Sequence, residues 1–289
     1  MDFSEALRAY ERDHPYQTRE VNGCTFRYCL CGNETARHTL VYLVGGSGNP
    51  SGWFRHVLAM EQEYRVLLCD YPVGVETMEG MAHLIAALTD SLQISKAVWI
   101  GASMGGYAAQ LLTKFYPERT DAQVLYATSC LSEQGIAALR QQYRGMGVLW
   151  WAMNHLPYPL LKALLIKPTL RRLMPAHCSP EEKAYLEGFI QWTYDGYTRE
   201  SDLHITRLQM SLAATTPVTA DDFAYIGRRT LLILPENDKA FPVEMQQDLI
   251  RTMAGASVET LDGGHLATLT CAEEYARRTA DFLHRLDRL

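Results

Sequence analysis

The sequence lacks an excess of positive charge. Its 289 residues include 27 Lys and Arg against 33 Asp and Glu, which gives a formal net charge of -6. Proteins that bind nucleic acids through the phosphates need clustered Lys and Arg. The composition therefore argues against a nucleic acid as the main partner.

Motifs for metal binding and redox chemistry are also missing. The seven cysteines are scattered, and no two of them form a Cys-x-x-Cys pair. Zinc sites and redox sites commonly use such pairs, so we expect no metal and no cofactor. The first residues are charged and contain no apolar stretch typical of a secretory signal. We therefore expect reduced thiols and a cytoplasmic location.

Long hydrophobic runs are absent, with one near exception. Residues 147–166 carry a single charge, on Lys162, and are long enough to cross a bilayer. Pro157 and Pro159 interrupt this run, and Asn154 lies near its middle. We predict two short helices that are separated by a turn and cover a pocket, with no integral membrane span. Attachment to a membrane surface is the alternative.

The first 130 residues contain a regular alternation of short apolar runs and helical patterns. Strands are predicted at residues 26–32, 39–44, 65–70, 97–101 and 123–128, and helices at residues 81–92 and 104–115. Apolar strands separated by helices are typical of βαβ units in a parallel sheet that is buried on both faces. The predicted fold class is α/β, with a mostly parallel central sheet flanked by helices.

The alternation stops near residue 131, and the pattern stays helical through residue 216. One helix there has a clear start, because Ser179, Pro180 and Glu182 form a capping box. Strands return at residues 230–234 and 257–261, and a last helix follows Thr270, with Glu273 three places on. We therefore predict a core at residues 1–130, an inserted helical cap at 131–216 and the rest of the core at 217–289.

The stretch VWIGASMGGYAAQLL, residues 98–112, joins a predicted strand to a predicted helix. Its turn holds Ser103 between Gly101 and Gly105, in the pattern Gly-x-Ser-x-Gly. Between a strand and a helix this pattern is typical of a nucleophile elbow, a sharp turn that exposes the serine hydroxyl at the sheet edge. The start of the following helix offers free N–H groups, so Met104 N–H is expected to be one oxyanion donor.

A second oxyanion donor is expected from the glycine-rich loop after the strand at residues 39–44. Gly45, Gly46 and Gly48 leave backbone N–H groups accessible there. We predict that the N–H of Ser47, or that of Gly46, completes the oxyanion hole. Such a donor contributes about 3–4 kcal/mol to catalysis in comparable sites.

A general base and its orienting acid are predicted on the two later strands. His265 follows the strand at 257–261, and Gly263 and Gly264 allow a short loop to bring its imidazole over the sheet edge. Asp238 follows the strand at 230–234, and Glu236 is its competitor for the role of the acid. The order Ser103, Asp238, His265 fits one of the known triad arrangements.

These residues resemble those of the α/β-hydrolase superfamily, and the resemblance covers nearly the whole chain. It rests on the Gly45-Gly46 loop, the Ser103 elbow, Asp238 followed by Pro242, and the Gly264-His265 pair. It implies an α/β-hydrolase fold in which the helical insertion is a cap over Ser103.

The chain departs from the superfamily pattern at two places. Gly45 stands where many relatives have histidine, and the segment at residues 70–74 reads DYPVG where many have Asp-x-Pro-Gly-x-Gly. The stretches YRVLLCDYPV and IGASMGGYAAQ are similar to the maspardin-like branch.

The predicted activity is that of a carboxylesterase-like serine hydrolase. It cleaves a carboxylic ester or thioester of a small-molecule substrate, small to medium in size and largely apolar, through an acyl-enzyme. The same triad serves C–C bond hydrolases and acyltransferases, and a protein-interaction module with little turnover is the alternative from another class. Aromatic residues are frequent in the predicted cap, where they belong to its core or line an apolar substrate pocket. The candidate substrate-binding residues are Trp150, Trp151, Trp192 and Tyr194. We expect a monomer or a homodimer.

Overall fold

The molecule is built on an eight-stranded sheet with the strand order β1-β2-β4-β3-β5-β6-β7-β8. The computed structural model describes residues 3–175 and 178–288, apart from the side chains of residues 166 and 167. The strands are β1 (Gln17–Val21), β2 (Cys24–Gly32), β3 (Thr39–Leu43), β4 (Arg65–Cys69), β5 (Ala97–Ala102), β6 (Thr120–Tyr126), β7 (Thr230–Pro235) and β8 (Ser257–Leu261).

The six strands from β4 through β3, β5, β6 and β7 to β8 pair parallel with one another, which confirms the predicted mostly parallel sheet. Strand β1 pairs antiparallel with β2, and β2 pairs antiparallel with β4. The sequence did not predict β1, because only Val21 of its five residues is buried. An edge strand that is exposed to solvent carries no apolar alternation for a pattern to detect.

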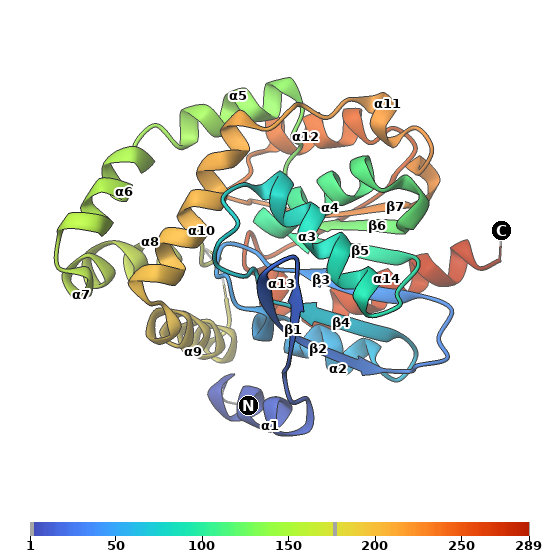
Figure 1. Cartoon of the computed structure of the whole chain (residues 1–289), viewed down its shortest axis with the longest axis horizontal. Coiled ribbons are helices and arrows are strands. Elements are labelled where there is room, and N and C mark those ends of the chain that lie inside the picture. The colour runs from blue at the N-terminus through green and yellow to red at the C-terminus, as the bar shows by residue number, and fades with distance from the viewer. Residues whose placement is uncertain (1–2, 176–177, 289) are drawn as a thin grey trace.

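Helices cover both faces of the sheet (Figure 1). The central strands have apolar side chains on both sides, which these helices bury. In β3, Val41 and Leu43 belong to one buried cluster, and Leu40 and Tyr42 belong to the other. The helices are α1 (Phe3–Asp13), α2 (Phe54–Met60), α3 (Met78–Ser91), α4 (Met104–Phe115), α5 (Glu133–Gln142), α6 (Met146–His155), α7 (Tyr158–Leu161), α8 (Lys167–Arg172), α9 (Pro180–Gly196), α10 (Arg199–Ser211), α11 (Ala220–Phe223), α12 (Val243–Thr252), α13 (Ala267–Thr270) and α14 (Ala272–Leu286). Helices α3 and α4 pack together on one face of the sheet, and α2 and α14 on the other.

The starts of the helices show which local sequence signals set the helix boundaries. Ser179 and Glu182 form the predicted capping box at the start of α9. Helix α3 begins at Met78, before the predicted residue 81, because the Thr77 side chain accepts a hydrogen bond from Gly80 N–H. The last helix follows Thr270 as predicted, but Thr270 and Glu273 do not form its cap. Thr270 ends the short helix α13, and α14 begins at Ala272 without a side-chain cap.

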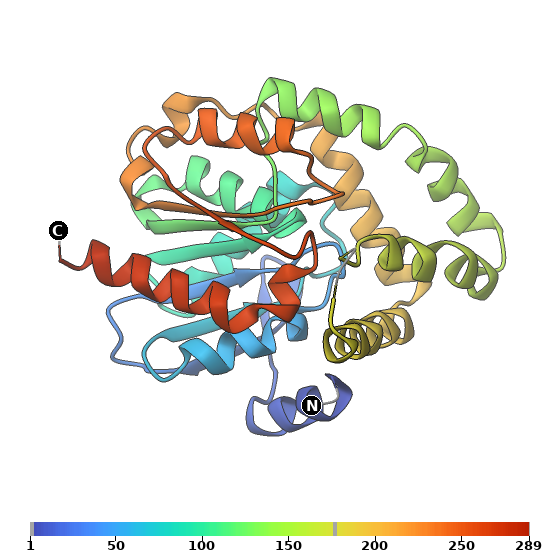
Figure 2. The ribbon, with the colours of Figure 1, turned by 180° about the vertical axis from the view of Figure 1, so that it is seen from behind.

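Helices α5 to α10, which we call the cap, lie together beside one end of the sheet, with α6 and α7 farthest from it (Figure 1, Figure 2). Among the described residues between β6 and β7 there is no strand. Residues 147–166 fold as predicted into short helices, since α6 ends at His155 and α7 begins after Pro157. Within the described part of the chain, no helix has both the length and the apolar character needed to cross a membrane.

Candidate active site

Ser103 lies in the turn between β5 and α4, with φ of 55° and ψ of -124°. Residues with a side chain rarely adopt a positive φ, so the surrounding structure must hold this conformation in place. Two hydrogen bonds contribute, because Ser103 N–H points to both Tyr126 O and Ala127 O at 3.1 Å. The turn has the geometry predicted for a nucleophile elbow.

Glycines on both sides of Ser103 allow the chain to turn this sharply. A Cβ atom at Gly101 would lie 2.2 Å from Gly105 O, and one at Gly105 would lie 2.2 Å from Leu43 O. Real Cβ atoms do not approach a carbonyl oxygen so closely. The two glycines therefore let α4 pack directly against β5 and β3, which places Ser103 at the edge of the sheet.

His265 and Asp238 meet at the same edge of the sheet. The loop that carries His265 turns through Gly263 and Gly264, which have φ of 115° and 66°. Asp238 follows β7, and its Oδ2 accepts a hydrogen bond from His265 Nδ1 at 2.9 Å. The other carboxylate oxygen, Oδ1, accepts the N–H groups of Ala240 at 2.7 Å and Phe241 at 3.2 Å. The carboxylate is buried, so these partners replace its lost hydration.

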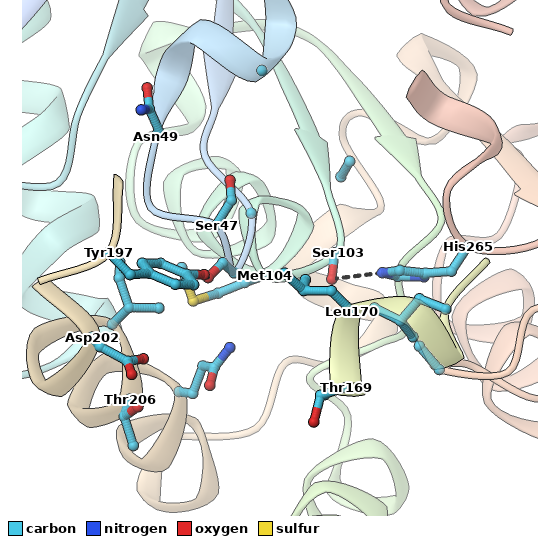
Figure 3. Close-up of a pocket in the computed structure, with 18 of the residues that line it drawn as sticks. Ser47, Asn49, Ser103, Met104, Thr169, Leu170, Tyr197, Asp202, Thr206 and His265 are labelled. Carbon is cyan, nitrogen blue, oxygen red and sulfur yellow. Dashed lines mark hydrogen bonds between the residues drawn. The ribbon is translucent and has the colours of Figure 1, made fainter. Parts of the chain in front are cut away.

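Ser103 completes a line of hydrogen bonds, since its Oγ lies 3.2 Å from His265 Nε2 (Figure 3). A carboxylate only accepts hydrogen bonds, so Nδ1 carries the imidazole proton that faces Asp238. Nε2 then keeps its lone pair toward the Ser103 hydroxyl. The arrangement can remove a proton from Ser103 when its oxygen attacks a substrate.

Glu236, the competing acid, does not reach the imidazole. Its side chain is exposed to solvent, and its contribution to this loop is its backbone oxygen, which accepts Gly264 N–H at 3.1 Å. The structure therefore places Asp238, and not Glu236, against His265.

The residues predicted to supply the oxyanion donors lie beside Ser103. Met104 is the first residue of α4, and a Cβ atom at Gly45 would lie 3.8 Å from Ser103 Cβ. Gly46 and Ser47 continue this loop and line the same cavity as Ser103 (Figure 3). The assignment of their backbone N–H groups as oxyanion donors stays a prediction.

A cavity of about 440 Å³ opens above the hydrogen-bonded line. Its floor is formed by residues at the strand ends, and its roof by apolar side chains of α6, α7 and α8. Among the roof residues are Leu149, Met153, Leu161 and Leu170. This confirms the prediction that residues 147–166 cover a pocket. Apolar lining with a few polar groups is typical of small-molecule sites.

The four aromatic residues proposed to bind substrate do not line this cavity. Trp151 is 55% exposed and stacks on His155, and Trp150 faces Arg207, because α6 turns Leu149 and Met153 inward instead. The Tyr194 ring faces Lys162 Nζ at 4.6 Å.

Trp192 packs against Phe3 and lines a second cavity, of about 560 Å³, on the other side of the loop at residues 45–49. The aromatic residues that do line the first cavity are Trp53, Tyr107, Tyr143, Tyr158, Phe189, Tyr197 and Phe241.

Two charged side chains from the cap border the cavity, and the sequence analysis did not single them out as site residues. Lys162 Nζ donates a hydrogen bond to Tyr197 O at 2.8 Å. Asp202 accepts one from the Tyr158 hydroxyl at 3.2 Å, and burial raises the pKa of its carboxyl above the ordinary value. The lining residues in the described part of the chain include no other Lys, Arg, Asp or Glu.

The cap is also joined to the loop of the predicted oxyanion hole. The Tyr197 hydroxyl donates a hydrogen bond to Gly46 O at 2.8 Å. Gln209 of α10 lies next to this loop, because a Cβ added at Gly46 would lie 3.0 Å from Gln209 Nε2. The Tyr197 side chain thus ties the loop to the cap, and no local sequence pattern marks it.

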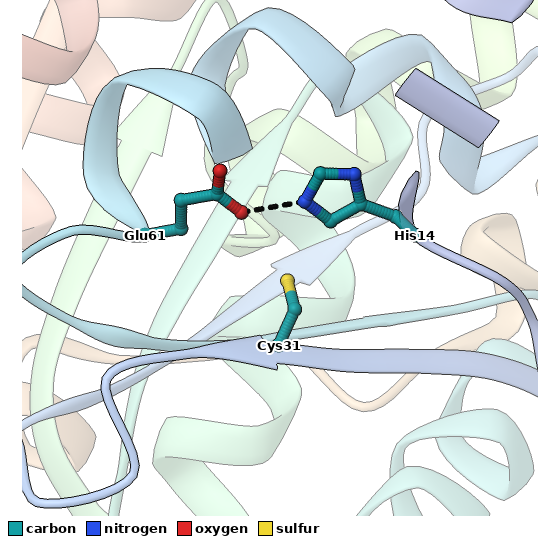
Figure 4. A group of neighbouring side chains, drawn as sticks. All are labelled: His14, Cys31 and Glu61. Carbon is teal, nitrogen blue, oxygen red and sulfur yellow. Dashed lines mark hydrogen bonds and ion pairs between the residues drawn. The ribbon is translucent and has the colours of Figure 1, made fainter. Parts of the chain in front are cut away.

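Away from the cavity, His14, Cys31 and Glu61 form a cluster of groups that can ligate a metal (Figure 4). His14 Nδ1 lies 2.9 Å from Tyr10 O, and Nε2 lies 2.6 Å from Glu61 Oε2. Partial burial lowers the pKa of His14, but the hydrogen bonds to Glu61 and Tyr10 outweigh it and raise that pKa above its ordinary value. A protonated imidazole satisfies both acceptors, so an ion pair accounts for this contact.

The sequence matches a known protein family. Residues 40–278 match the Alpha/beta hydrolase family. A 2-hydroxy-6-oxononadienedioate/2-hydroxy-6-oxononatrienedioate hydrolase of Burkholderia vietnamiensis is 27% identical, over 91% of this chain and 93% of its own length. The enzyme of the same name from Klebsiella pneumoniae is 26% identical, over 92% of this chain and 94% of its own length.

Solved structures show the same fold. The enol-lactonase from Burkholderia xenovorans superposes with a TM-score of 0.71 at 18% identity, over 93% of this chain and all of that one. A thermophilic esterase from Thermogutta terrifontis gives 0.70 at 19% identity, over 93% of this chain and 98% of its own. At such low identity the likeness concerns the fold alone. A place in the maspardin-like branch stays a prediction.

Proposed function

Because the chain belongs to the alpha/beta hydrolase family, we propose that it is a serine hydrolase with Ser103 as nucleophile, His265 as base and Asp238 as the orienting acid. The observation that carries this proposal is the hydrogen-bonded line from Ser103 through His265 to Asp238 at the floor of a cavity. The N–H groups of Met104 and of Ser47 or Gly46 are the proposed oxyanion donors.

The bond we propose to be cleaved is a carbon–carbon bond next to a ketone. The curated relatives, which cover about nine tenths of the chain, are named for 2-hydroxy-6-oxo dienedioates. A compound of this kind contains no ester or amide, so its hydrolysis must break a carbon–carbon bond beside the 6-oxo group. The names of these relatives support carbon–carbon cleavage more strongly than the ester cleavage that the sequence alone favoured.

Each proposed residue has a defined role in this reaction. Ser103 Oγ bonds to the ketone carbon while its proton passes to His265 Nε2, and the oxyanion donors bind the oxygen. The step requires the 2-oxo tautomer of the substrate, in which the proton of the 2-hydroxyl group has moved to C5. The C5–C6 bond then breaks, its electron pair is delocalised onto the 2-oxo oxygen of the leaving fragment, and His265 returns the proton to that oxygen. Water, deprotonated by His265, attacks the acyl-enzyme and releases a carboxylic acid and free Ser103.

The charges of the cavity suggest which acids would fit best. A dienedioate carries two carboxylates, whereas the described residues that line the cavity offer one lysine, Lys162, near one half-buried acid, Asp202. A second carboxylate would be buried without a cation, which is unfavourable. We therefore propose a substrate with one carboxylate and an otherwise apolar acyl group.

Turnover of a pair of matched acids tests this proposal. We expect kcat/KM to be about tenfold or more higher for a 2-hydroxy-6-oxo dienoate with a methyl ketone than for the dienedioate, since one unpaired charge costs at least ~1.4 kcal/mol. Loss of the dienoate absorbance measures the rate. A preference for the dienedioate would contradict the charge argument.

Ester hydrolysis remains the second candidate, favoured by the mostly apolar lining of the cavity. Cleavage of aryl esters without cleavage of either dienoate would support it. A fluorophosphonate probe separates both hydrolases from an interaction module, because an unassisted serine does not react at a useful rate. Labelling should disappear in Ser103→Ala and fall sharply in His265→Ala.

A further inference from the structure

The charge of the chain is distributed very unevenly. Residues 134–180 contain six Lys and Arg and no Asp or Glu, although the whole chain has a net charge of -6. The rest of the chain therefore carries a formal charge of -12. This basic segment spans helices α5 to α8 of the cap. Arg144 and Arg172 are exposed there.

The same segment carries half of the exposed large apolar side chains among the described residues. Among the described residues, twelve large hydrophobic side chains are exposed, and six of them lie between residues 148 and 165. We call these six the apolar tip: Val148, Trp151, Leu156, Leu160, Leu164 and Leu165. Val148 is 73% exposed, Leu164 62% and Trp151 55%. The other six exposed side chains are scattered over the rest of the chain.

The apolar tip differs from the solvent-facing side of an ordinary amphipathic helix. In α6, Leu149 and Met153 face the cavity while Val148 and Trp151 face solvent, so the helix is apolar on both sides. A surface helix normally has a polar outer face. Figures 1 and 2 show α6 and α7 as the part of the cap farthest from the sheet, where an external surface can reach them.

We propose that the apolar tip docks on the surface of an anionic lipid bilayer. Apolar side chains that include a tryptophan can enter the boundary between headgroups and acyl chains, while flanking Lys and Arg are attracted to anionic headgroups. Docking of a second copy of the chain by the same face is disfavoured, because two basic segments would then lie against each other.

Vesicle flotation with the full chain tests the proposal. We expect binding to vesicles of phosphatidylcholine with phosphatidylglycerol, weaker binding to phosphatidylcholine alone, and release by salt. Trp151→Glu should lower the partition coefficient about tenfold, because it removes apolar contact and adds a repelled charge. Val243→Glu is the matched control, since Val243 is 57% exposed but lies on α12, outside the tip.

The outcomes separate this inference from its rivals. Equal binding of wild type and Trp151→Glu, or no binding to anionic vesicles, would overturn it. A dimer in sedimentation that Trp151→Glu dissociates would assign the tip to a second copy instead. Thermal melting checks that each variant is folded. Ser103→Ala should bind vesicles like the wild type, so the inference can stand or fall independently of the proposed hydrolase activity.

Discussion

At the scale of single residues, Asp238 shows how backbone amides and burial can distinguish two nearby carboxylates. Both Asp238 and Glu236 follow β7, but Asp238 accepts two backbone N–H groups and faces His265, whereas Glu236 is exposed. The sequence leaves this choice open, because both side chains follow the same strand. The backbone amides that hold the carboxylate form only when the loop folds.

Replacing the acid should therefore have a far larger effect than replacing its neighbour. We expect Asp238→Asn to lower kcat about 10⁴-fold, as loss of the acid that fixes the tautomer does in related triads. Glu236→Gln is the matched control and should change kcat only slightly. Steady-state kinetics on the best substrate measures both, and the opposite ranking would give the role to Glu236.

His56 links stability to pH, because it is buried in α2 and its Nε2 lies 2.8 Å from Thr268 O. Burial lowers its pKa to about 4, below the value of 6.5 expected for an unfolded chain. Between these two values the unfolded chain binds a proton that the folded chain does not. The free energy of unfolding therefore falls as the pH decreases through this window, by on the order of 3 kcal/mol in total.

His56→Gln should reduce this pH dependence, since glutamine can donate to Thr268 O without titrating. Urea unfolding at pH 7 and pH 4.5 measures the effect, and the wild type should lose more stability than the variant. His155→Gln, at an exposed position on α6, is the control and should behave like the wild type. An equal loss in wild type and His56→Gln would show that His56 is not the cause.

At the scale of elements, the contact of α4 with the sheet depends on the absence of side chains. Gly105→Ala would place a Cβ atom 2.2 Å from Leu43 O, on the rigid strand β3. We expect a loss of about 1–3 kcal/mol or more of stability from such overpacking, and displacement of Ser103. Gly147→Ala in α6, where an added Cβ meets nothing within 4 Å, should be neutral or stabilising. Chemical denaturation compares the two variants.

The elements that the sequence predicted best are those with strong internal patterns. The buried strands, α4 and the capping box of α9 follow from residues next to each other in the chain. The lining of the cavity could not be predicted in the same way. Helix α6 is apolar on both faces, so its sequence does not indicate which side faces the cavity. In the structure, Leu149 faces the cavity and Trp151 faces solvent.

At the scale of the whole molecule, the residues of the triad were predictable because parallel strands end at the same edge of the sheet. Ser103, Asp238 and His265 each follow a strand, so the topology alone brings them close together. Lys162 and Tyr197 reach the cavity from the cap, whose path over the sheet depends on long-range packing. No spacing in the sequence relates them to Ser103.

The hydrogen bond from Tyr197 to Gly46 has a thermodynamic consequence for this division into core and cap. A contact between two parts of a molecule couples their equilibria, and such coupling is reciprocal. Whatever fixes the loop at residues 45–48 also stabilises the packing of the cap against it, and loss of that packing frees the loop to the same degree. An anionic ligand held by the loop would therefore slow hydrogen exchange in α9 and α10, even where it touches neither helix.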